Sequence, residues 1–262
     1  MSKIKVLFVA NPVKTLAFKM LGVHFDVLAS GISSLAANLD FPSKIYEIAR
    51  DSIRTKKGIL RLLDEAISNY QPTVIAMDTM TMQLEATQRM AKHIRKKFSS
   101  IKIVVGGWHI NGIKLEGIPP QGFEDFDFLV WGDGEHTLNE LCSAIDSKIT
   151  DFSNIAGLIW PRKGEWIINN AASLVDLKKI KRPFRDNYFN PDGFYNNPRL
   201  TEFTVFCVET LRGCVNKCSY CCTPAIHGSV IRKFEIQYVI EDLLKIKHQK
   251  GKQIFISDEN AL

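Results

Sequence analysis

Short apolar runs alternate with longer amphipathic stretches over the first 150 residues. Five runs predict buried strands, at residues 5–10, 43–49, 73–78, 101–107 and 127–132. Four stretches with apolar residues at helical spacing predict helices, at residues 31–40, 58–70, 83–98 and 134–145. Strands rich in Val, Ile and Leu with helices between them predict a parallel sheet covered on both faces. The predicted fold class is therefore α/β, with a doubly wound N-terminal sheet of five strands whose carboxyl ends bind ligands.

The pattern changes after residue 150. Two apolar runs around a turn predict a hairpin at residues 155–170, and residues 174–198 read as a linker because they lack a clean period. A strand at 201–210, a helix at 236–247 and a strand at 253–258 predict a second unit. We therefore expect an N-terminal domain at 1–150, a hairpin and linker at 151–200, and the start of another domain at 201–262.

Composition places the chain among ordinary globular proteins. Of its 262 residues 45% are hydrophobic, which is enough for a sizeable core, and no apolar run approaches the roughly 20 residues of a membrane span. The N-terminus reads as a strand rather than a signal peptide, because Asn11 and Pro12 follow a short apolar core. These features predict a cytoplasmic protein, in which clustered cysteines indicate metal or redox chemistry.

The net charge is +6, and part of it comes from the basic run at residues 89–97. The run reads as a solvated face near a helix C-terminus, where cations suit the helix dipole. A nucleic-acid patch is the alternative, but neither interleaved aromatic residues nor a binding motif accompanies it. We therefore expect no nucleic-acid partner.

Four of the six cysteines lie in LRGCVNKCSYCC, residues 211–222. Cys214, Cys218 and Cys221 have the spacing C-x3-C-x2-C, and thiolates are ligands for iron–sulfur clusters and for zinc. Structural zinc usually takes four ligands, so a zinc site would need His227 as well, because Cys222 is adjacent to Cys221. Unrelated buried thiols are the third interpretation.

The segment CVNKCSYC, after a strand and Arg212-Gly213, resembles the cluster loop of radical S-adenosylmethionine (SAM) enzymes. The resemblance implies that the three cysteines hold a four-iron four-sulfur (4Fe-4S) cluster with one open iron that SAM occupies. One electron from the cluster then cleaves SAM to a 5'-deoxyadenosyl radical. The resemblance also implies that Tyr220 lies near the adenine of SAM, and it gives Cys222 no role.

The N-terminal half resembles the Rossmann-like cobalamin-binding domain that precedes the radical SAM barrel in one large subclass. The matching stretches are VLFVANP, GISSLAANL, PTVIAMDTMT, IVVGGWH and VWGDGEHTLNEL. By this resemblance cobalamin lies near seven residues at the strand ends: Asn11, Pro12, Thr79, Thr81, Gly106, Gly107 and Glu135. The alternative is that the two glycines form a tight turn and that a threonine caps the next helix.

The resemblance has departures. The cobalt-binding histidine motif of cobalamin domains, Asp-x-His-x-x-Gly, is not matched around His24, where Gly22 and Val27 replace its Asp and Gly. Neither His24 nor His109 is therefore assigned as a ligand.

Residues 201–262 resemble the start of a partial (β/α) radical SAM barrel, including the acidic stretch at 258–260 that ends its second strand. A full (β/α) barrel takes roughly 250 residues. We therefore expect a fragment, an interrupted gene, or a chain that a partner completes.

The predicted function is that of a cobalamin-dependent radical SAM enzyme, with methyl transfer or related carbon-centred radical chemistry that is incomplete in this chain. A small-molecule substrate and an electron donor such as flavodoxin or ferredoxin are its expected partners. Two alternatives stay open: a non-catalytic module that binds cobalamin or a cluster, and a zinc-stabilised interaction protein.

Overall fold

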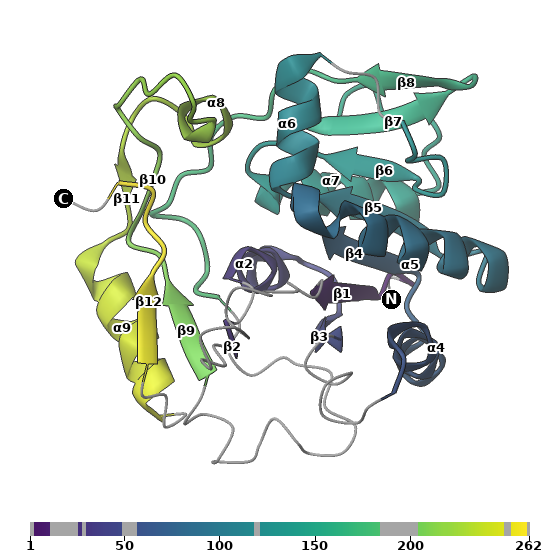
Figure 1. Cartoon of the computed structure of the whole chain (residues 1–262), viewed down its shortest axis with the longest axis horizontal. Helices are drawn as coiled ribbons and strands as arrows, with labels where there is room; N and C mark the ends of the chain where they lie inside the picture. Colours follow the sequence, from purple (N-terminus) through teal and green to yellow (C-terminus); the bar gives the residue numbers. More distant parts are fainter. Residues whose placement is uncertain are drawn as a thin grey trace. The chain divides into compact units, whose positions relative to one another are not determined.

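The structure, a computed structural model, describes residues 3–10, 26–27, 30–48, 57–117, 121–183, 204–248 and 253–260. The chain forms two compact units (Figure 1). Unit 1 comprises Met1–Val13 and Leu39–Val175, and unit 2 comprises Lys14–Asn38 and Asp176–Leu262. The units are not consecutive segments, because unit 2 includes a piece of the N-terminal region. Asn11, Pro12 and His24 lie outside the described residues.

Unit 1 is built on a seven-stranded sheet ordered β3-β1-β4-β5-β6-β7-β8. Its strands are β1 (Val6–Ala10), β3 (Ser43–Glu47), β4 (Val74–Asp78), β5 (Lys102–Gly106), β6 (Phe128–Val130), β7 (Leu158–Arg162) and β8 (Glu165–Ile168). The first five strands of this order are parallel, and every residue of β1 is buried. The parallel sheet confirms the predicted α/β fold. Strand β1 is apolar throughout because it is covered on both faces.

The hairpin extends the sheet beyond the five predicted strands. β7 pairs antiparallel with β6 and with β8, and its residues Leu158, Ile159 and Trp160 are buried. The Trp160 indole donates a hydrogen bond to Asn169 Oδ1 (3.1 Å). The sequence pattern of a hairpin is the same whether it stands alone or joins a sheet, so the pattern cannot show this pairing.

The helices of unit 1 pack around the sheet (Figure 1). They are α4 (Ile59–Tyr70), α5 (Leu84–Lys97), α6 (Trp108–Glu116) and α7 (Gly134–Asp146), with a short 3-10 helix η1 (Thr81–Gln83) before α5. The basic run lies on α5, where Lys97 and His93 contact Asp64 at 2.7 and 2.8 Å and Arg95 contacts Asp127 at 2.5 Å. His93, Arg95 and Lys97 thus have carboxylate partners within unit 1.

Helix α6 is the longest of the elements that the sequence pattern misses. It contains Asn111 and Gly112 in its middle, and both residue types are weak helix formers. Asn111 is nevertheless buried, because its amide nitrogen donates to the Gly107 carbonyl (3.0 Å) and its amide oxygen accepts from the Gly132 N–H (2.7 Å). The bond from Gly132 is a tertiary contact, and it supports a helix that its local sequence favours only weakly.

Unit 2 contains a parallel sheet ordered β12-β9-β2 and a two-stranded antiparallel pair. Its strands are β2 (Asp26–Val27), β9 (Thr204–Val208), β10 (Leu211–Arg212), β11 (Arg232–Lys233) and β12 (Gln253–Ile256). Its helices are α2 (Ser30–Asn38), α8 (Thr223–His227) and α9 (Ile236–His248). Helix α2 belongs to this unit although it precedes most of unit 1 in sequence; the Asn38 side chain accepts a hydrogen bond from the Lys181 N–H (2.8 Å). Of the helices that the structure describes, none combines the length and apolarity needed to cross a membrane.

The ends of β4 and β5 are tied together through backbone. The Thr79 N–H donates to the Gly106 carbonyl (2.9 Å), and the Thr79 carbonyl accepts from the His109 N–H (3.1 Å). Gly107 lies between these bonds at φ 99°, and a Cβ on it would be 2.9 Å from the Thr79 oxygen. Only glycine fits such a left-handed position against another backbone.

We expect Gly107→Ala to destabilise unit 1 by about 1–3 kcal/mol, because the substitution adds both backbone strain and a clash. Gly112→Ala in the adjoining helix is the matched control, since a Cβ there meets nothing within 4 Å. It should change stability by no more than about 1 kcal/mol, in the stabilising direction. Urea unfolding followed by circular dichroism measures both, and equal stabilities for the two variants would contradict the proposed role of Gly107.

Candidate functional site

The cysteine loop, residues 213–222, connects β10 to α8 in unit 2. All six cysteines of the chain lie in described residues and are free thiols. Cys214 is 7% exposed, whereas Cys218 and Cys221 are exposed. In the described part of the chain, no three His, Cys, Asp or Glu side chains are already gathered as a metal site. The thiols therefore fit an iron–sulfur cluster by type and spacing, and their side chains must converge to hold it.

Gly213 lets the start of the loop pass against the turn that follows α8. Its φ is 91°, and a Cβ on it would lie 2.3 Å from the Val230 carbonyl oxygen and 3.0 Å from that of Gly228. The next residue, Cys214, donates its N–H to the Gly228 carbonyl (3.2 Å). The glycine that precedes the first cysteine is thus required by backbone packing.

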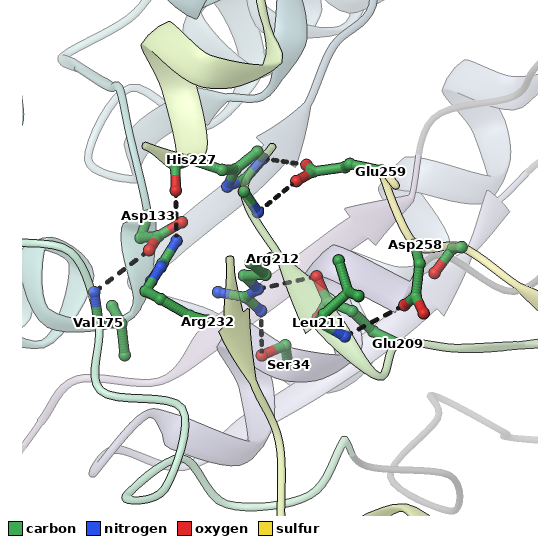
Figure 2. Close-up of polar contacts among 12 residues, drawn as sticks. Ser34, Asp133, Val175, Glu209, Leu211, Arg212, His227, Arg232, Asp258 and Glu259 are labelled. Atoms are coloured by element: carbon green, nitrogen blue, oxygen red, sulfur yellow. Dashed lines mark hydrogen bonds and ion pairs between the residues drawn. The ribbon is translucent and has the colours of Figure 1, made fainter. Parts of the chain in front are cut away.

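A carboxylate from the end of β12 holds the segment that leads into the loop. Asp258 Oδ1 accepts hydrogen bonds from the backbone N–H groups of Thr210 (2.6 Å) and Leu211 (3.2 Å). Its other oxygen accepts from the Thr210 hydroxyl. Figure 2 shows Asp258 beside Leu211 at the start of this segment.

Glu259 lies next along the chain and makes two further contacts (Figure 2). Its Oε2 accepts a hydrogen bond from the Gly213 N–H (2.7 Å), and its Oε1 lies 3.2 Å from His227 Nε2. The sequence pattern marks residues 258–260 only as a strand end and His227 only as an alternative zinc ligand. The structure places a Glu259 carboxylate oxygen beside the His227 ring.

A buried cation also supports the loop entry. Arg212 is 5% exposed, and its Nε donates to Glu209 Oε1 at 2.8 Å. Its Nη2 contacts the Ser34 hydroxyl of α2 at 3.4 Å (Figure 2). Because a buried guanidinium needs a charged partner, the pair with Glu209 fixes the residue before Gly213.

The environments of the thiols differ in their electrostatics. Hydrogen bonds from the Thr223 hydroxyl and N–H lower the pKa of the exposed Cys221 thiol, which favours the thiolate that binds metal. Burial raises the pKa of Cys142, on α7, to about 12, so that thiol is inert. Tyr220 is 90% exposed, and negative charge on Cys218 raises the pKa of its phenol. Cys222 is exposed and precedes the first residue of α8.

In unit 1, the residues predicted to lie near cobalamin have different settings at the carboxyl ends of the strands. Thr79 is buried, and its hydroxyl donates to the Met80 carbonyl and accepts from Thr87 Oγ1 (both 3.1 Å). Thr81 is exposed, with its hydroxyl 3.1 Å from His109 Nδ1. Glu135 is buried in the first turn of α7. A Cβ on Gly106 would lie 3.2 Å from the Val130 carbonyl oxygen, and a Cβ on Gly107 would lie 2.9 Å from that of Thr79.

Exposed apolar side chains at the same strand ends have no part in the sequence prediction. Met82, after β4, is 75% exposed, and Trp108, after β5, is 39% exposed. Burial lowers the pKa of nearby His109, which favours its neutral form. At the end of β6, Trp131 Nε1 is buried without an acceptor among the described residues. Apolar surface with a few polar groups at the carboxyl ends of parallel strands fits a large organic cofactor.

Comparison with known proteins gives no match to a protein-family model. The cobalamin-dependent radical SAM methyltransferase TokK of Streptomyces tokunonensis is 25% identical over 231 residues, which cover 86% of this chain and 31% of TokK. A 2-(S-pantetheinyl)-carbapenam-3-carboxylate methyltransferase of Streptantibioticus cattleyicolor is 21% identical over 234 residues, with the same two coverages, 86% and 31%. The chain thus spans 31% of the length of these curated relatives.

Two solved structures share the fold over almost the whole chain. The cobalamin-dependent SAM radical enzyme OxsB, with aqua-cobalamin and SAM bound, has a TM-score of 0.75 at 19% identity and covers 98% of this chain and 34% of OxsB. The radical SAM methyltransferase TsrM of Kitasatospora setae, with cobalamin and a [4Fe-4S] cluster bound, has a TM-score of 0.70 at 16% identity and covers 99% of this chain and 48% of TsrM. The predicted resemblance is confirmed: in sequence and in fold, the relatives of this chain are cobalamin-dependent radical SAM enzymes.

Proposed function

We propose that this chain binds a 4Fe-4S cluster and SAM through unit 2 and cobalamin through unit 1, as part of a cobalamin-dependent radical SAM enzyme. The observation that carries the proposal is the loop of three free thiols, Cys214, Cys218 and Cys221, directly after β10. Methyl transfer is the proposed reaction, because TokK and TsrM are named as methyltransferases.

The cluster, when bound, supplies the electron that cleaves SAM to methionine and a 5'-deoxyadenosyl radical. Three cysteine ligands leave one iron open for SAM, as three protein ligands do at open catalytic metal sites. Thr223 favours the thiolate of Cys221, and Tyr220 is exposed and free to lie along the adenine of SAM. The residues of unit 2 thus hold the cofactors in place while the cofactors carry the chemistry.

Cobalamin, when bound, carries the methyl group that is transferred. The proposed contacts in unit 1 are the exposed Thr81, Met82 and Trp108, together with the backbone around Gly106 and Gly107. The hydroxyl of Thr79 is already engaged inside unit 1, so its contribution is to shape the strand end. Asn11, Pro12 and Glu135 remain predicted contacts.

The exposure of strand β12, at the edge of the unit 2 sheet, is the basis for proposing that further strands pair with it. β12 is an edge strand of the described sheet, and its residues Ile254, Phe255 and Ile256 are 47%, 57% and 57% exposed. An exposed apolar edge strand is a template for pairing with another strand. We propose that further strand–helix units of a (β/α) barrel cover it, whichever polypeptide carries them. A flavodoxin or ferredoxin as electron donor, a small-molecule substrate and a cytoplasmic location complete the proposal.

Cys214→Ala should abolish most cluster loading, because two thiolates hold the cluster weakly. After anaerobic reconstitution with iron and sulfide, the unmodified chain should carry about four irons and the variant fewer than about one. Cys222→Ala is the matched control and should load like the unmodified chain, since Cys222 lies outside the motif. Equal iron contents in Cys214→Ala and the unmodified chain would sink the cluster assignment.

Trp108→Ala should weaken cobalamin binding about fivefold or more, because it removes apolar area that the cofactor would cover. Leu115→Ala, at the other end of α6, removes a side chain of similar exposure (44% against 39%) and should leave the affinity within about twofold. Absorbance titration with hydroxocobalamin measures both. The unit 1 assignment fails if the unmodified chain retains no corrin after gel filtration.

The reconstituted chain also separates an active enzyme from a binding module. SAM and dithionite are added, and 5'-deoxyadenosine is quantified against the Cys214→Ala variant. Product above that background assigns SAM cleavage to this chain. A well-loaded chain without product favours the module, with turnover restored only when further barrel strands are supplied.

A further inference from the structure

The two ends of the cysteine loop are joined by one side chain. Glu259 contacts the Gly213 N–H, immediately before Cys214, and the His227 imidazole, at the end of the helix after Cys221. Its side chain is 13% exposed, so these contacts are largely shielded from water. Figure 2 shows both contacts converging on the Glu259 carboxylate.

Other contacts brace the same two points. Asp258 fixes Thr210 and Leu211 ahead of Gly213, and Arg232 donates to the His227 carbonyl at 2.8 Å. The Cys214 N–H donates to the Gly228 carbonyl. Hydrogen bonds therefore hold both ends of the cysteine loop, and the cysteines lie between these two ends.

The contacts of Glu259 indicate a geometric role. One carboxylate oxygen accepts the Gly213 N–H (2.7 Å), and the other lies 3.2 Å from His227 Nε2, so a single side chain spans both ends of the loop. Carboxylate acceptors make stronger hydrogen bonds than neutral ones.

We propose that Glu259, braced by Asp258, is a positioning residue that fixes the span of the cysteine loop and so sets the spacing of Cys214 and Cys221 for the cluster. The inference deepens the proposed function and rests on it for the cluster. Its structural part concerns the loop alone and can be tested without metal.

The first test uses the full-length, metal-free chain under reducing conditions. Iodoacetamide labelling of each cysteine is followed by peptide mass spectrometry in the unmodified chain, Glu259→Ala, Glu259→Gln and the control Glu235→Ala. Cys214 is 7% exposed, and loss of its anchor should raise its labelling rate about tenfold or more in Glu259→Ala. Cys207 on neighbouring β9 and Cys142 are buried internal references and should stay protected.

The Glu259→Gln variant distinguishes the hydrogen bond that Glu259 makes from its negative charge. Glutamine keeps an oxygen for the Gly213 N–H, so Glu259→Gln should keep Cys214 labelling within about threefold of the unmodified chain. Glu235 is an exposed partner of Lys178, so Glu235→Ala should not change labelling. An unchanged Cys214 rate in Glu259→Ala, or a rate in Glu259→Gln equal to that of Glu259→Ala, overturns the proposal.

If Glu259→Ala also raises the labelling rate of Cys207, the variant has opened unit 2 as a whole. The Glu259→Asp variant is then used in place of Glu259→Ala. The shorter side chain cannot reach Gly213 and His227 together, so faster labelling of Cys214 with Cys207 protected supports the proposal. A Cys214 rate equal to that of the unmodified chain overturns it.

The second test uses the reconstituted chain and reads the cluster directly. Glu259→Gln should load iron like the unmodified chain and shift the cluster's reduction potential upward, because a nearby negative charge is lost. Glu259→Ala should lose iron, which glutamine restores. Equal iron contents and potentials in all three chains overturn a role at the cluster. If the unmodified chain loads no iron while Cys214 protection still depends on Glu259, the proposed function fails and the loop anchor stands.

Discussion

The carboxylates at the end of β12 accept backbone hydrogen bonds from the segment after β9, and the organisation of the cysteine loop depends on this contact. It is possible because β12 and β9 run parallel, which brings the carboxyl ends of both strands to one edge of the sheet. The register continues beyond the strands, where the Ser257 N–H donates to the Val208 carbonyl (3.0 Å). Asp258 and Glu259 then lie within reach of residues almost 50 positions earlier in the chain (46 to 48 positions). A segment with little regular structure of its own thus gains fixed ends from strand pairing.

The same constraint operates in unit 1 with backbone groups in place of carboxylates. Thr79 at the end of β4 exchanges hydrogen bonds with Gly106 and His109 at the end of β5, and Gly107 allows that approach. Polar and apolar groups after the strands are therefore presented from a rigid base. In both units the residues that would contact cofactors follow the carboxyl ends of strands, on a loop in unit 2 and mainly on the first turns of helices in unit 1.

The sequence predicts the strands of unit 1 well because buried parallel strands carry continuous apolar runs, as β1 and β5 do. It misses α6, whose middle residues are weak helix formers and whose Asn111 side chain accepts a tertiary hydrogen bond from Gly132. The cysteine loop is identified from spacing alone, because metal-binding chemistry demands particular residues at short intervals. The roles of Glu259 and His227 could not be predicted in this way. Their contact spans 32 positions, and nothing in the local pattern of either residue indicates the other.

The central claim is that the three cysteines hold a cluster with an iron open to SAM. Electron paramagnetic resonance of the reconstituted, dithionite-reduced chain, recorded before and after addition of SAM, tests it most directly. The account predicts a reduced 4Fe-4S signal whose g-values change when SAM is added, because SAM occupies the open iron. A spectrum that SAM leaves unchanged, or a cluster signal that persists in the Cys214→Ala chain, would contradict it.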